Sequence, residues 1–425
     1  MRYSREKCHP ASTRNASRRS EGAEGPDDPL FHVKPTAAEM ATPADPDLPV
    51  DPGSRSAPPA TRGTTAVLAA TSSLRPPTLL HVARAAGVST ATVSRAFNRP
   101  DTVREPLRQR VRAAVEQLRY IPNDAARTLA SQRSRVLGAI VPTIDNAIFA
   151  QGVAAIQARA EASGYSLLLA ACDYDLDREL AQARTMVARG VEALVLVGTR
   201  HRPALRELLR EHSIPHVCQG AFAPEEDPHC VGFDNRRAGM LVARYLLALG
   251  HRRIGMIAGR RRDNDRAEGR VAGVHAVLAE AGLLPPPPPV LAGEPPLMQT
   301  GESSWLVEST YAFDAARAAA RTLLTRPARP TALICGNDIL ALGALRECQS
   351  LGLAVPGQVS ITGFDDLALA RQATPALTTI RVATSMMGEA AAEFVLAGLA
   401  GQSAIATEIP FKLVIRASTG PAPAN

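Results

Sequence analysis

The stretch HVARAAGVSTATVSRAFNRP, residues 81–100, decides the fold of the first structured part of the chain. It is rich in alanine and cationic, it holds few bulky apolar side chains, and Gly87, Val88 and Ser89 interrupt it at its middle. A helix that only packs in a core would avoid this glycine, and a loop would not carry helical periodicity. The stretch therefore predicts two short helices that meet at an angle, the second of which fits into a groove.

The flanking residues extend this pattern to three helices. Thr78 is suited to cap the first helix and Ser89 the second, in which Val93 and Phe97 lie four residues apart and face inward. A third helix is predicted from Glu105 to Arg119 because it has one apolar stripe: Leu107, Val111, Ala114 and Leu118.

The charge of the chain is concentrated in the same region. The 425 residues have a net charge of +7, and residues 76–135 alone carry this excess, with 11 Arg against 4 acidic groups. A local basic excess is typical of a module that contacts phosphates. The outward face of the second helix offers side chains that suit base edges in a major groove: Thr90, Ala91, Ser94, Arg95 and Asn98. An ordinary three-helix bundle with a solvated arginine face is the alternative.

From residue 135 onward, the pattern changes to alternating strands and helices. Seven apolar runs are predicted as strands: 136–142, 166–172, 193–198, 215–220, 253–259, 331–336 and 359–365. Continuous apolar strands alternating with amphipathic helices favour parallel sheets covered on both faces. Because seven or more strand–helix units are too many for one sheet, we expect two doubly wound lobes. The whole chain is therefore predicted as an α + α/β protein in which a helical head precedes these lobes.

The remaining segments suggest how the chain is divided. Residues 1–77 hold 12 prolines and few large apolar groups, which predicts a disordered extension, and translation could begin at Met40 or later. The proline-rich stretch 283–303 is predicted as an irregular connection of unknown role. We expect a head at 78–122, a hinge at 123–135, a core at 136–420 and a tail at 421–425. The lobe crossovers are expected near residues 232–236, 376–381 and 396–408.

Cysteine usage and hydropathy limit the possible compartments. The six cysteines, at 8, 172, 218, 230, 335 and 348, have no spacing that suits zinc, which favours reduced thiols in a cytoplasm. If the basic module binds DNA, we expect the protein at the nucleoid. No run of 18 apolar residues suggests a membrane span, and the N-terminus lacks the apolar core of a secretory signal. The nine histidines are scattered, and His251 and His275 have no obvious partners.

Ligands of doubly wound lobes bind beyond the carboxyl ends of the strands. The candidates at these positions are Asp145, Asn146, Ile148, Phe149, Gln219, Asn337, Asp338 and Asp365. Carboxylates and amides suit a polyhydroxylated ligand, and Phe149 is suited to stack on a sugar or base ring. An aspartate after a strand is also a common helix cap, and for Asp338 both interpretations stay open.

Motifs along most of the chain resemble one family of bacterial regulators. LLHVARAAGVSTATVSRAFNRP (79–100), VGFDN (231–235), LGHRRIGMIAG (249–259), GNDILALGAL (336–345) and VPGQVSITGFDDLALA (355–370) are similar, in order, to the lactose/galactose repressor (LacI/GalR) family. The resemblance covers about residues 78–420. It implies a helix–turn–helix head, a hinge helix, and a periplasmic-binding-protein-like core that binds a small molecule and dimerises.

The resemblance also implies roles for individual residues. Contacts to DNA fall on Thr78, Leu79, Ser89, Thr90, Ala91, Thr92, Ser94, Arg95, Asn98, Tyr120, Asn123, Ala126, Arg127 and Leu129. The hinge is implied to fold when two subunits meet on DNA, with Leu129 as an apolar wedge in the minor groove. Arg270 matches an arginine that anchors the effector in relatives. Arg104 departs from the pattern, because relatives usually have a Ser or Thr cap there. Either the cap of this helix is weaker or Arg104 adds a phosphate contact.

Together these features predict a dimeric regulator, with repression as its expected action, that binds a near-palindromic operator and responds to a sugar or sugar acid. An exported sugar-binding protein and an enzyme on Rossmann-like lobes are the alternatives. The basic head and the missing signal speak against the first. Against the second, no phosphate-cradling glycine motif and no catalytic triad stand out. We expect no cofactor and no metal.

Overall fold

The computed structural model describes residues 76–121, 133–285 and 305–424. The predicted hinge contacts Asn123, Ala126, Arg127 and Leu129, most of the extension 1–77 and most of the loop 283–303 lie outside the described residues. None of the described helices combines the length and the apolar character needed to cross a bilayer.

The head consists of α1 (Leu79–Ala86), α2 (Thr90–Asn98), the short 3-10 turn η1 (Pro100–Thr102) and α3 (Glu105–Leu118). Its small core is built from Val82, Ala83, Ala86, Val93, Val111, Ala114 and Tyr120. Gly87 ends α1 in the left-handed conformation, with φ of 62°, and the Ser89 hydroxyl caps α2 by accepting a hydrogen bond from the Thr92 N–H at 3.1 Å. The predicted helix–turn–helix is therefore confirmed.

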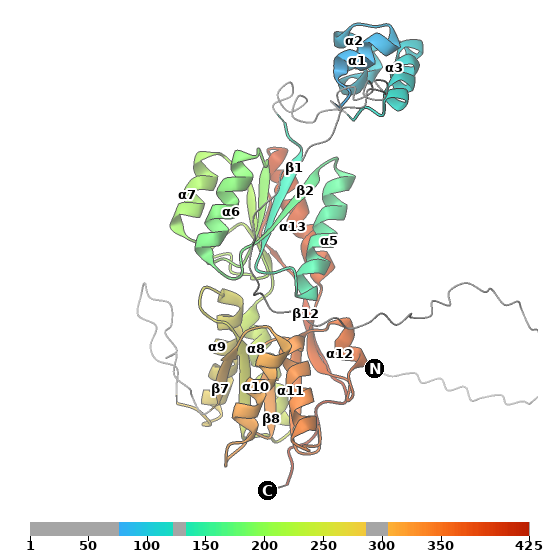
Figure 1. The fold of residues 1–425 in the computed structure, drawn as a ribbon. Coiled ribbons are helices and arrows are strands. Elements are labelled where there is room, and N and C mark those ends of the chain that lie inside the picture. Colours follow the sequence, from blue (N-terminus) through green and yellow to red (C-terminus); the bar gives the residue numbers. More distant parts are fainter. Residues whose placement is uncertain (1–75, 122–132, 286–304, 425) are drawn as a thin grey trace, which may run out of the picture. The chain divides into compact units, whose positions relative to one another are not determined.

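The first lobe has a six-stranded sheet in the order β11-β5-β4-β3-β1-β2. Its strands are β1 (Val136–Val141), β2 (Ser166–Ala171), β3 (Ala193–Val197), β4 (His216–Gln219), β5 (Cys230–Gly232) and β11 (Thr407–Glu408). Helices α5 (Ala147–Ala162) and α13 (Thr384–Leu399) cover one face, and α6 (Leu176–Ala188) and α7 (Pro203–Glu211) cover the other (Figure 1).

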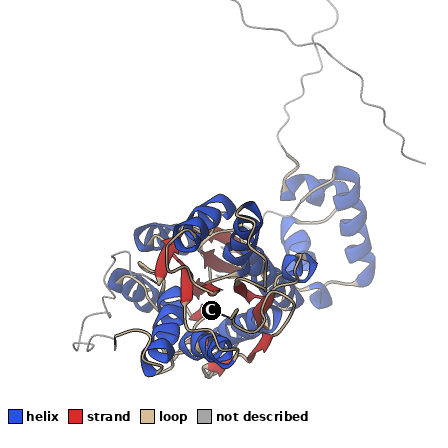
Figure 2. Ribbon diagram, turned by 90° about the horizontal axis from the view of Figure 1, so that it is seen from below, coloured by secondary structure: helices blue, strands red, loops and turns tan. Residues whose placement is uncertain are grey.

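The second lobe repeats this plan with the strand order β12-β10-β9-β8-β6-β7. Its strands are β6 (Ile254–Gly259), β7 (Leu306–Ser309), β8 (Ala332–Cys335), β9 (Ser360–Asp365), β10 (Thr378–Val382) and the antiparallel β12 (Phe411–Val414). Helices α8 (Asn235–Ala248) and α9 (Asp265–Glu280) pack on one face, and α10 (Phe313–Leu324) and α11 (Asp338–Ser350) pack on the other. The short α12 spans Ala368–Gln372. Helices surround the strands in the view along the core (Figure 2).

All seven predicted strands are present within one or two residues of their expected ends, which confirms the two-lobed core. The chain passes between the sheets three times: after Gly232, after Val382 and after Glu408. The predicted second crossover, 376–381, is largely occupied by β10, and the predicted third crossover, 396–408, begins in α13 and ends in β11, so both passages follow the predicted segments.

His251, for which the sequence offers no obvious partner, has three hydrogen-bond partners in the structure. Its imidazole is completely buried, with Nδ1 2.9 Å from the Thr331 hydroxyl and Nε2 3.1 Å from both the Ser360 hydroxyl and the Gly420 carbonyl oxygen. These partners come from three distant segments, which sequence spacing does not reveal. His251 therefore ties the C-terminal segment to the second lobe. The five described cysteines are buried and free, as expected for reduced thiols.

Candidate functional site

Helix α2 carries six of the ten predicted DNA-contacting residues that the structure describes. Thr90, Ala91, Arg95 and Asn98 are exposed, while Thr92 and Ser94 are half-buried. The Arg95 Nε donates to the Ala91 carbonyl oxygen at 3.3 Å, and the Asn98 amide donates to the Ser94 hydroxyl at the same distance. These weak local bonds leave the side chains free to exchange protein partners for DNA.

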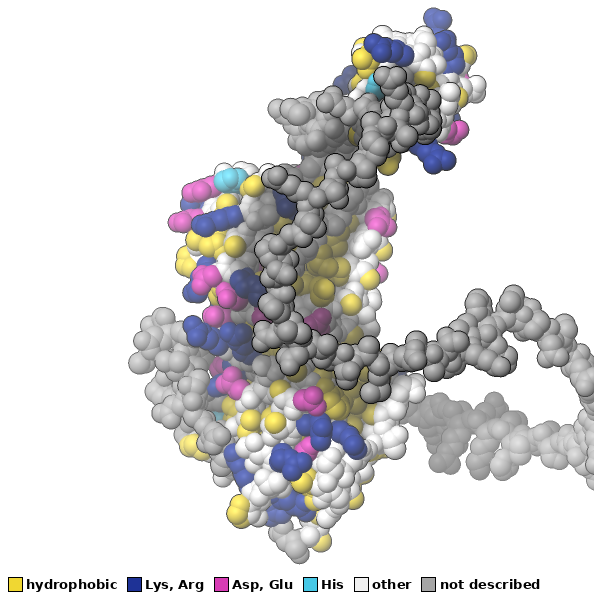
Figure 3. All heavy atoms as spheres, viewed as in Figure 1, with side chains coloured by type: hydrophobic (Ala, Val, Ile, Leu, Met, Phe, Trp, Pro, Cys, Tyr) yellow, Lys and Arg dark blue, Asp and Glu magenta, His cyan; other side chains and the backbone are white. Residues whose placement is uncertain are grey.

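Three other predicted contacts of the head differ in exposure. Thr78 is exposed and Leu79 half-buried, whereas Tyr120 is only 8% exposed and packs against Phe97 with ring centroids 6.3 Å apart. Tyr120 therefore belongs mainly to the core of the head. Arginines dominate the charged surface of the head, as the dark blue side chains in Figure 3 show. Arg104 precedes α3 without a side-chain cap bond, so this substitution leaves the helix without its usual cap.

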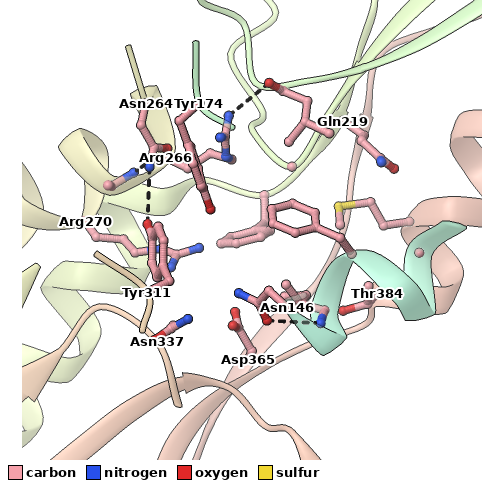
Figure 4. Close-up of a pocket in the computed structure, with 18 residues that line it drawn as sticks. Asn146, Tyr174, Gln219, Asn264, Arg266, Arg270, Tyr311, Asn337, Asp365 and Thr384 are labelled. Atoms are coloured by element: carbon pink, nitrogen blue, oxygen red, sulfur yellow. Dashed lines mark hydrogen bonds between the residues drawn. The ribbon is translucent and has the colours of Figure 1, made fainter. Parts of the chain in front are cut away.

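A pocket lies between the two lobes and is partly open to solvent. Seven of the nine predicted effector residues line it: Asn146, Ile148, Phe149, Gln219, Arg270, Asn337 and Asp365. They come from both lobes, as the labelled side chains in Figure 4 show. The prediction that the ends of parallel strands meet in one site therefore describes the geometry of this pocket.

Arg270 is fixed on the second lobe by neutral partners. Its Nε donates to the Asn235 Oδ1 at 2.9 Å and its Nη1 to the Gly336 carbonyl oxygen at 2.6 Å, while its Cζ lies 3.7 Å from the centre of the Phe364 ring. Burial lowers the pKa of Arg270, and the nearby Asp365 carboxylate opposes that effect. The guanidinium is therefore held rigidly at the pocket wall.

Asp365 ends β9 in an unusual backbone conformation, with φ of 109°. Its side chain is 7% exposed, and burial raises the pKa of this carboxyl well above its usual range, although Arg270 acts in the opposite direction. The Oδ1 atom has no hydrogen-bond partner among the described residues. Strained backbone and an unsatisfied buried oxygen are features that cluster at ligand sites.

Two further polar atoms at the pocket are buried without a partner in the described structure: the Gln219 Oε1 and the Asn337 Nδ2. Asn337 uses its Oδ1 to cap α11, accepting from the Leu340 N–H at 2.9 Å, which orients the amide nitrogen away from the helix. A buried polar atom left unsatisfied costs about 1–3 kcal/mol, so a ligand that pairs with these atoms recovers that cost.

Aromatic rings form the apolar part of the pocket. Tyr174 of the first lobe and Tyr311 of the second stack with centroids 5.3 Å apart and an interplanar angle of 25°. Asn264 donates to the Tyr311 hydroxyl oxygen at 3.2 Å and so orients that ring (Figure 4). Rings of this kind suit the flat apolar faces of a cyclic ligand.

The lobes are tied together beside the pocket. The Asp265 Oδ2 at the start of α9 accepts from the Thr199 N–H at 2.7 Å, and Arg266 donates to the Val197 carbonyl oxygen at 3.1 Å. Asn235 donates to the Gly220 carbonyl oxygen at 2.9 Å. Burial opposes the charge on Asp265, but Arg266 and the Thr199 N–H outweigh it and hold the pKa of Asp265 below its usual range. The contacts describe lobes that are closed on each other at this edge.

Two of the predicted effector residues are not in the pocket. Asp145 is exposed and does not line it, whereas the neighbouring Asn146 caps α5 and does. Asp338 is completely buried and points elsewhere: it accepts from the Thr379 hydroxyl at 2.6 Å and from the Leu367 N–H at 2.7 Å. The structure thus places Asp338 as a tie between α11, α12 and β10, and Asn337 is the cap.

Several further residues line the pocket without having been predicted from the sequence: Tyr174, Phe233, Asn264, Arg266, Tyr311, Thr384 and Met387. Tyr174, Asn264 and Tyr311 follow β2, β6 and β7 at the carboxyl ends of strands, so the same argument could have found them. Thr384 and Met387 belong to α13, which follows a strand of one lobe and packs on the other. The predicted crossover near 376–381 lies just before α13, but no local signal shows which side chains of this helix reach the pocket.

Comparisons with known proteins agree with this architecture. Residues 78–123 match the model for bacterial regulatory proteins of the lacI family, and residues 243–419 match the periplasmic binding protein-like domain. The transcriptional repressor PurR of Escherichia coli is 33% identical over 321 residues, which are 75% of this chain and 89% of the relative.

Solved structures are similar as well. A lac repressor dimer bound to operator and the anti-inducer ONPF has a TM-score of 0.69 at 26% identity, over 81% of this chain and 100% of that one. A LacI family protein from Silicibacter pomeroyi has the same TM-score at 27% identity, over 81% and 99%.

A helix–turn–helix head followed by a two-lobed periplasmic-binding-protein-like core defines a DNA-binding regulator. The chain belongs to the LacI family of bacterial transcriptional regulators. The relatives are DNA-binding transcriptional repressors and not enzymes, so the enzyme alternative is set aside, and the match of the head likewise removes the exported binding protein.

Proposed function

We propose that this chain represses transcription as a homodimer on a near-palindromic operator, and that a sugar or sugar acid bound between the lobes switches its affinity for DNA. One head contacts only a half-site, so a two-fold dimer matches a two-fold operator. The solved lac repressor is itself a dimer on its operator with a ligand bound. In this account the protein acts in the cytoplasm, at the nucleoid.

The main support for a ligand in this pocket is a set of buried polar atoms without partners among the described residues: Gln219 Oε1, Asn337 Nδ2 and Asp365 Oδ1. The Gln219 Oε1 is an acceptor and the Asn337 Nδ2 is a donor. The Asp365 Oδ1 is an acceptor that becomes a donor when the carboxyl group is protonated. Alternating donors and acceptors beside aromatic rings match the hydroxyl groups and apolar faces of a sugar ring. Arg270 adds a positive charge at the same wall, which suits the carboxylate of a sugar acid.

The switch follows from what the ligand contacts. A molecule that pairs with Gln219 of the first lobe and with Asn337 and Asp365 of the second favours one arrangement of the lobes. Any ligand with different affinities for two arrangements shifts the balance between them. We propose that Asn123, Ala126, Arg127 and Leu129 form a hinge helix on DNA that senses this balance, with Leu129 as the minor-groove wedge.

Selection of randomised duplex DNA on the purified full-length chain, with and without a panel of sugars and sugar acids, tests this proposal. We expect a roughly palindromic site whose occupancy changes with one compound. An enriched site whose occupancy no sugar or sugar acid changes would contradict the proposed effector. Failure to enrich any site would remove the DNA-binding part.

A further inference from the structure

A cluster of metal-ligating side chains lies in the first lobe, at the end of β4 away from the effector pocket. It consists of His216, the first residue of β4, and of Asp227 and His229, in the segment that leads into β5. One nitrogen of each imidazole and one oxygen of the carboxylate lie within 4.8 Å of one another. Neither the DNA-binding face nor the effector pocket uses these residues.

The geometry of the cluster is close to that of a bound ion. Donor atoms around a tetrahedral zinc ion, with bonds of about 2.0–2.1 Å, lie roughly 3.3 Å apart. The Nδ1 of His229 is 3.4 Å from the Oδ1 of Asp227, and the rings of His216 and His229 have centroids 4.8 Å apart. Small rotations of the two imidazoles therefore bring all three donors to bonding distance of one ion.

We propose that His216, Asp227 and His229 form a binding site for a divalent transition-metal ion, with Zn²⁺ as the ion that suits them best. Two imidazoles and one carboxylate are a donor set that zinc commonly takes with three protein ligands and one open position. The two histidines line a surface groove with Arg206, Phe394 and Gly398, so an ion enters from solvent and keeps its open position there.

Asp227 is prepared for this role by its surroundings. Its side chain is 5% exposed, and its Oδ1 accepts from the His229 N–H at 2.9 Å, which fixes the carboxylate. On the buried side, the Cys218 thiol donates to its Oδ2 at 3.5 Å. Hydrogen bonds that orient a ligating carboxylate are typical of metal sites.

Without metal, Arg206 supplies the balancing charge: its Nη2 lies 3.5 Å from the Asp227 Oδ2. The Arg206 side chain is 49% exposed and its Nη2 also donates to the Thr199 carbonyl oxygen at 3.0 Å, so Arg206 keeps a protein partner when an ion neutralises Asp227. A purely structural ion pair between Arg206 and Asp227 is the competing explanation. It assigns no role to the two imidazoles.

Titration of the full-length chain with Zn²⁺ against a chromophoric chelator tests the site. His229→Ala removes a half-exposed ligand with little effect on packing, and His212→Ala removes an exposed histidine of the same lobe outside the cluster. We expect His229→Ala to bind one ion fewer, or to bind it at least about 10- to 100-fold more weakly, the loss seen when only an outer-shell partner is removed. His212→Ala should match the unaltered chain.

A second variant and a second readout guard against misfolding and against zinc bound elsewhere. Asp227→Asn keeps the shape of the side chain and should also weaken the site, and both variants should retain operator binding. Co²⁺ in the unaltered chain should give the intense visible absorption of a tetrahedral site, which His229→Ala abolishes. Equal zinc affinity in the unaltered chain, His229→Ala and His212→Ala would overturn the proposal.

Discussion

Asp265 of the second lobe and Thr199 of the first are joined by two hydrogen bonds: the Asp265 Oδ2 accepts from the Thr199 N–H at 2.7 Å and from its hydroxyl at 3.1 Å. The Asp265 Oδ1 also pairs with Arg266, which in turn donates to the first lobe. Both charged side chains are nearly buried, at 13% and 11% exposure. This contact closes one edge of the effector pocket.

Asp265→Ala should therefore loosen the closed arrangement. The substitution leaves the Arg266 charge and the Thr199 N–H without their partner, a loss of about 3–5 kcal/mol when a buried pair is broken. Thr199→Val is the matched control, because it removes the hydroxyl and keeps the N–H, at a cost of about 1 kcal/mol. Small-angle scattering and calorimetric ligand binding measure the effect. Equal ligand affinity in the two variants would show that the contact does not stabilise closure.

The buried Asp338 gives the core a characteristic pH dependence. Burial raises the pKa of Asp338 to about 7, against the hydrogen bonds from Thr379 and Leu367. An aspartate in the unfolded chain ionises near about pH 3.9. Between these values the folded chain holds a proton that the unfolded chain has released, so the contribution of Asp338 to stability falls as the pH rises through this window.

Asp338→Asn should remove that dependence. Its amide oxygen still accepts from the Leu367 N–H and its nitrogen donates to the Thr379 hydroxyl oxygen. The variant should thus gain stability over the unaltered chain by roughly 2–4 kcal/mol as the pH rises from 5 to 8. Urea unfolding at several pH values measures the difference. Parallel pH profiles for the two chains would mean that Asp338 is ionised throughout.

Close contact between α8 and α9 holds Arg270 in place. A Cβ atom on Gly239 would lie 2.3 Å from the Arg270 carbonyl oxygen. Gly239→Ala should therefore destabilise the core by about 1–3 kcal/mol and weaken ligand binding, because α9 must shift with its arginine. Gly357→Ala, whose Cβ would meet only the Ala354 side chain at 3.6 Å, should stay within about 0.5 kcal/mol. Thermal unfolding and ligand titration of both variants decide this, and equal behaviour would contradict it.

On the DNA-binding face, Arg95 is expected to contact a base edge. Arg95→Ala should cost about 1–3 kcal/mol of operator affinity and relax the preference at one base pair. Arg112 on α3 is also exposed but lies off α2, so Arg112→Ala should leave base preference unchanged. Binding to operators with single base changes, at two salt concentrations, separates the effects. An unchanged base preference in Arg95→Ala would exclude direct base contact.

The sequence predicts those features that depend on local composition, and it does not predict those that depend on contacts between residues far apart in the chain. Strands such as β3 (ALVLV) are buried along their whole length, so their composition reveals them. β5, β11 and β12 are short, and β7 (LVES) and β10 (TTIRV) mix polar with apolar residues without a regular pattern, so pairing with neighbouring strands decides them. For the pocket, strand ends predicted Asn146, Gln219 and Asp365, but the orientation of Asp338 depends on Thr379, 41 residues away.

The central claim is that a ligand between the lobes controls affinity for DNA, and Asn337→Asp tests it most directly. The change keeps the oxygen that caps α11 and removes the unpartnered amide donor in the pocket. We would measure operator binding by fluorescence anisotropy while titrating the active compound. The compound should change the operator affinity of the unaltered chain by about 5- to 150-fold.

In Asn337→Asp, operator affinity without compound should be unchanged. The concentration of compound needed for the same response should rise about tenfold or more. An identical titration in both chains would contradict the account, because the compound would then act from a site other than this pocket.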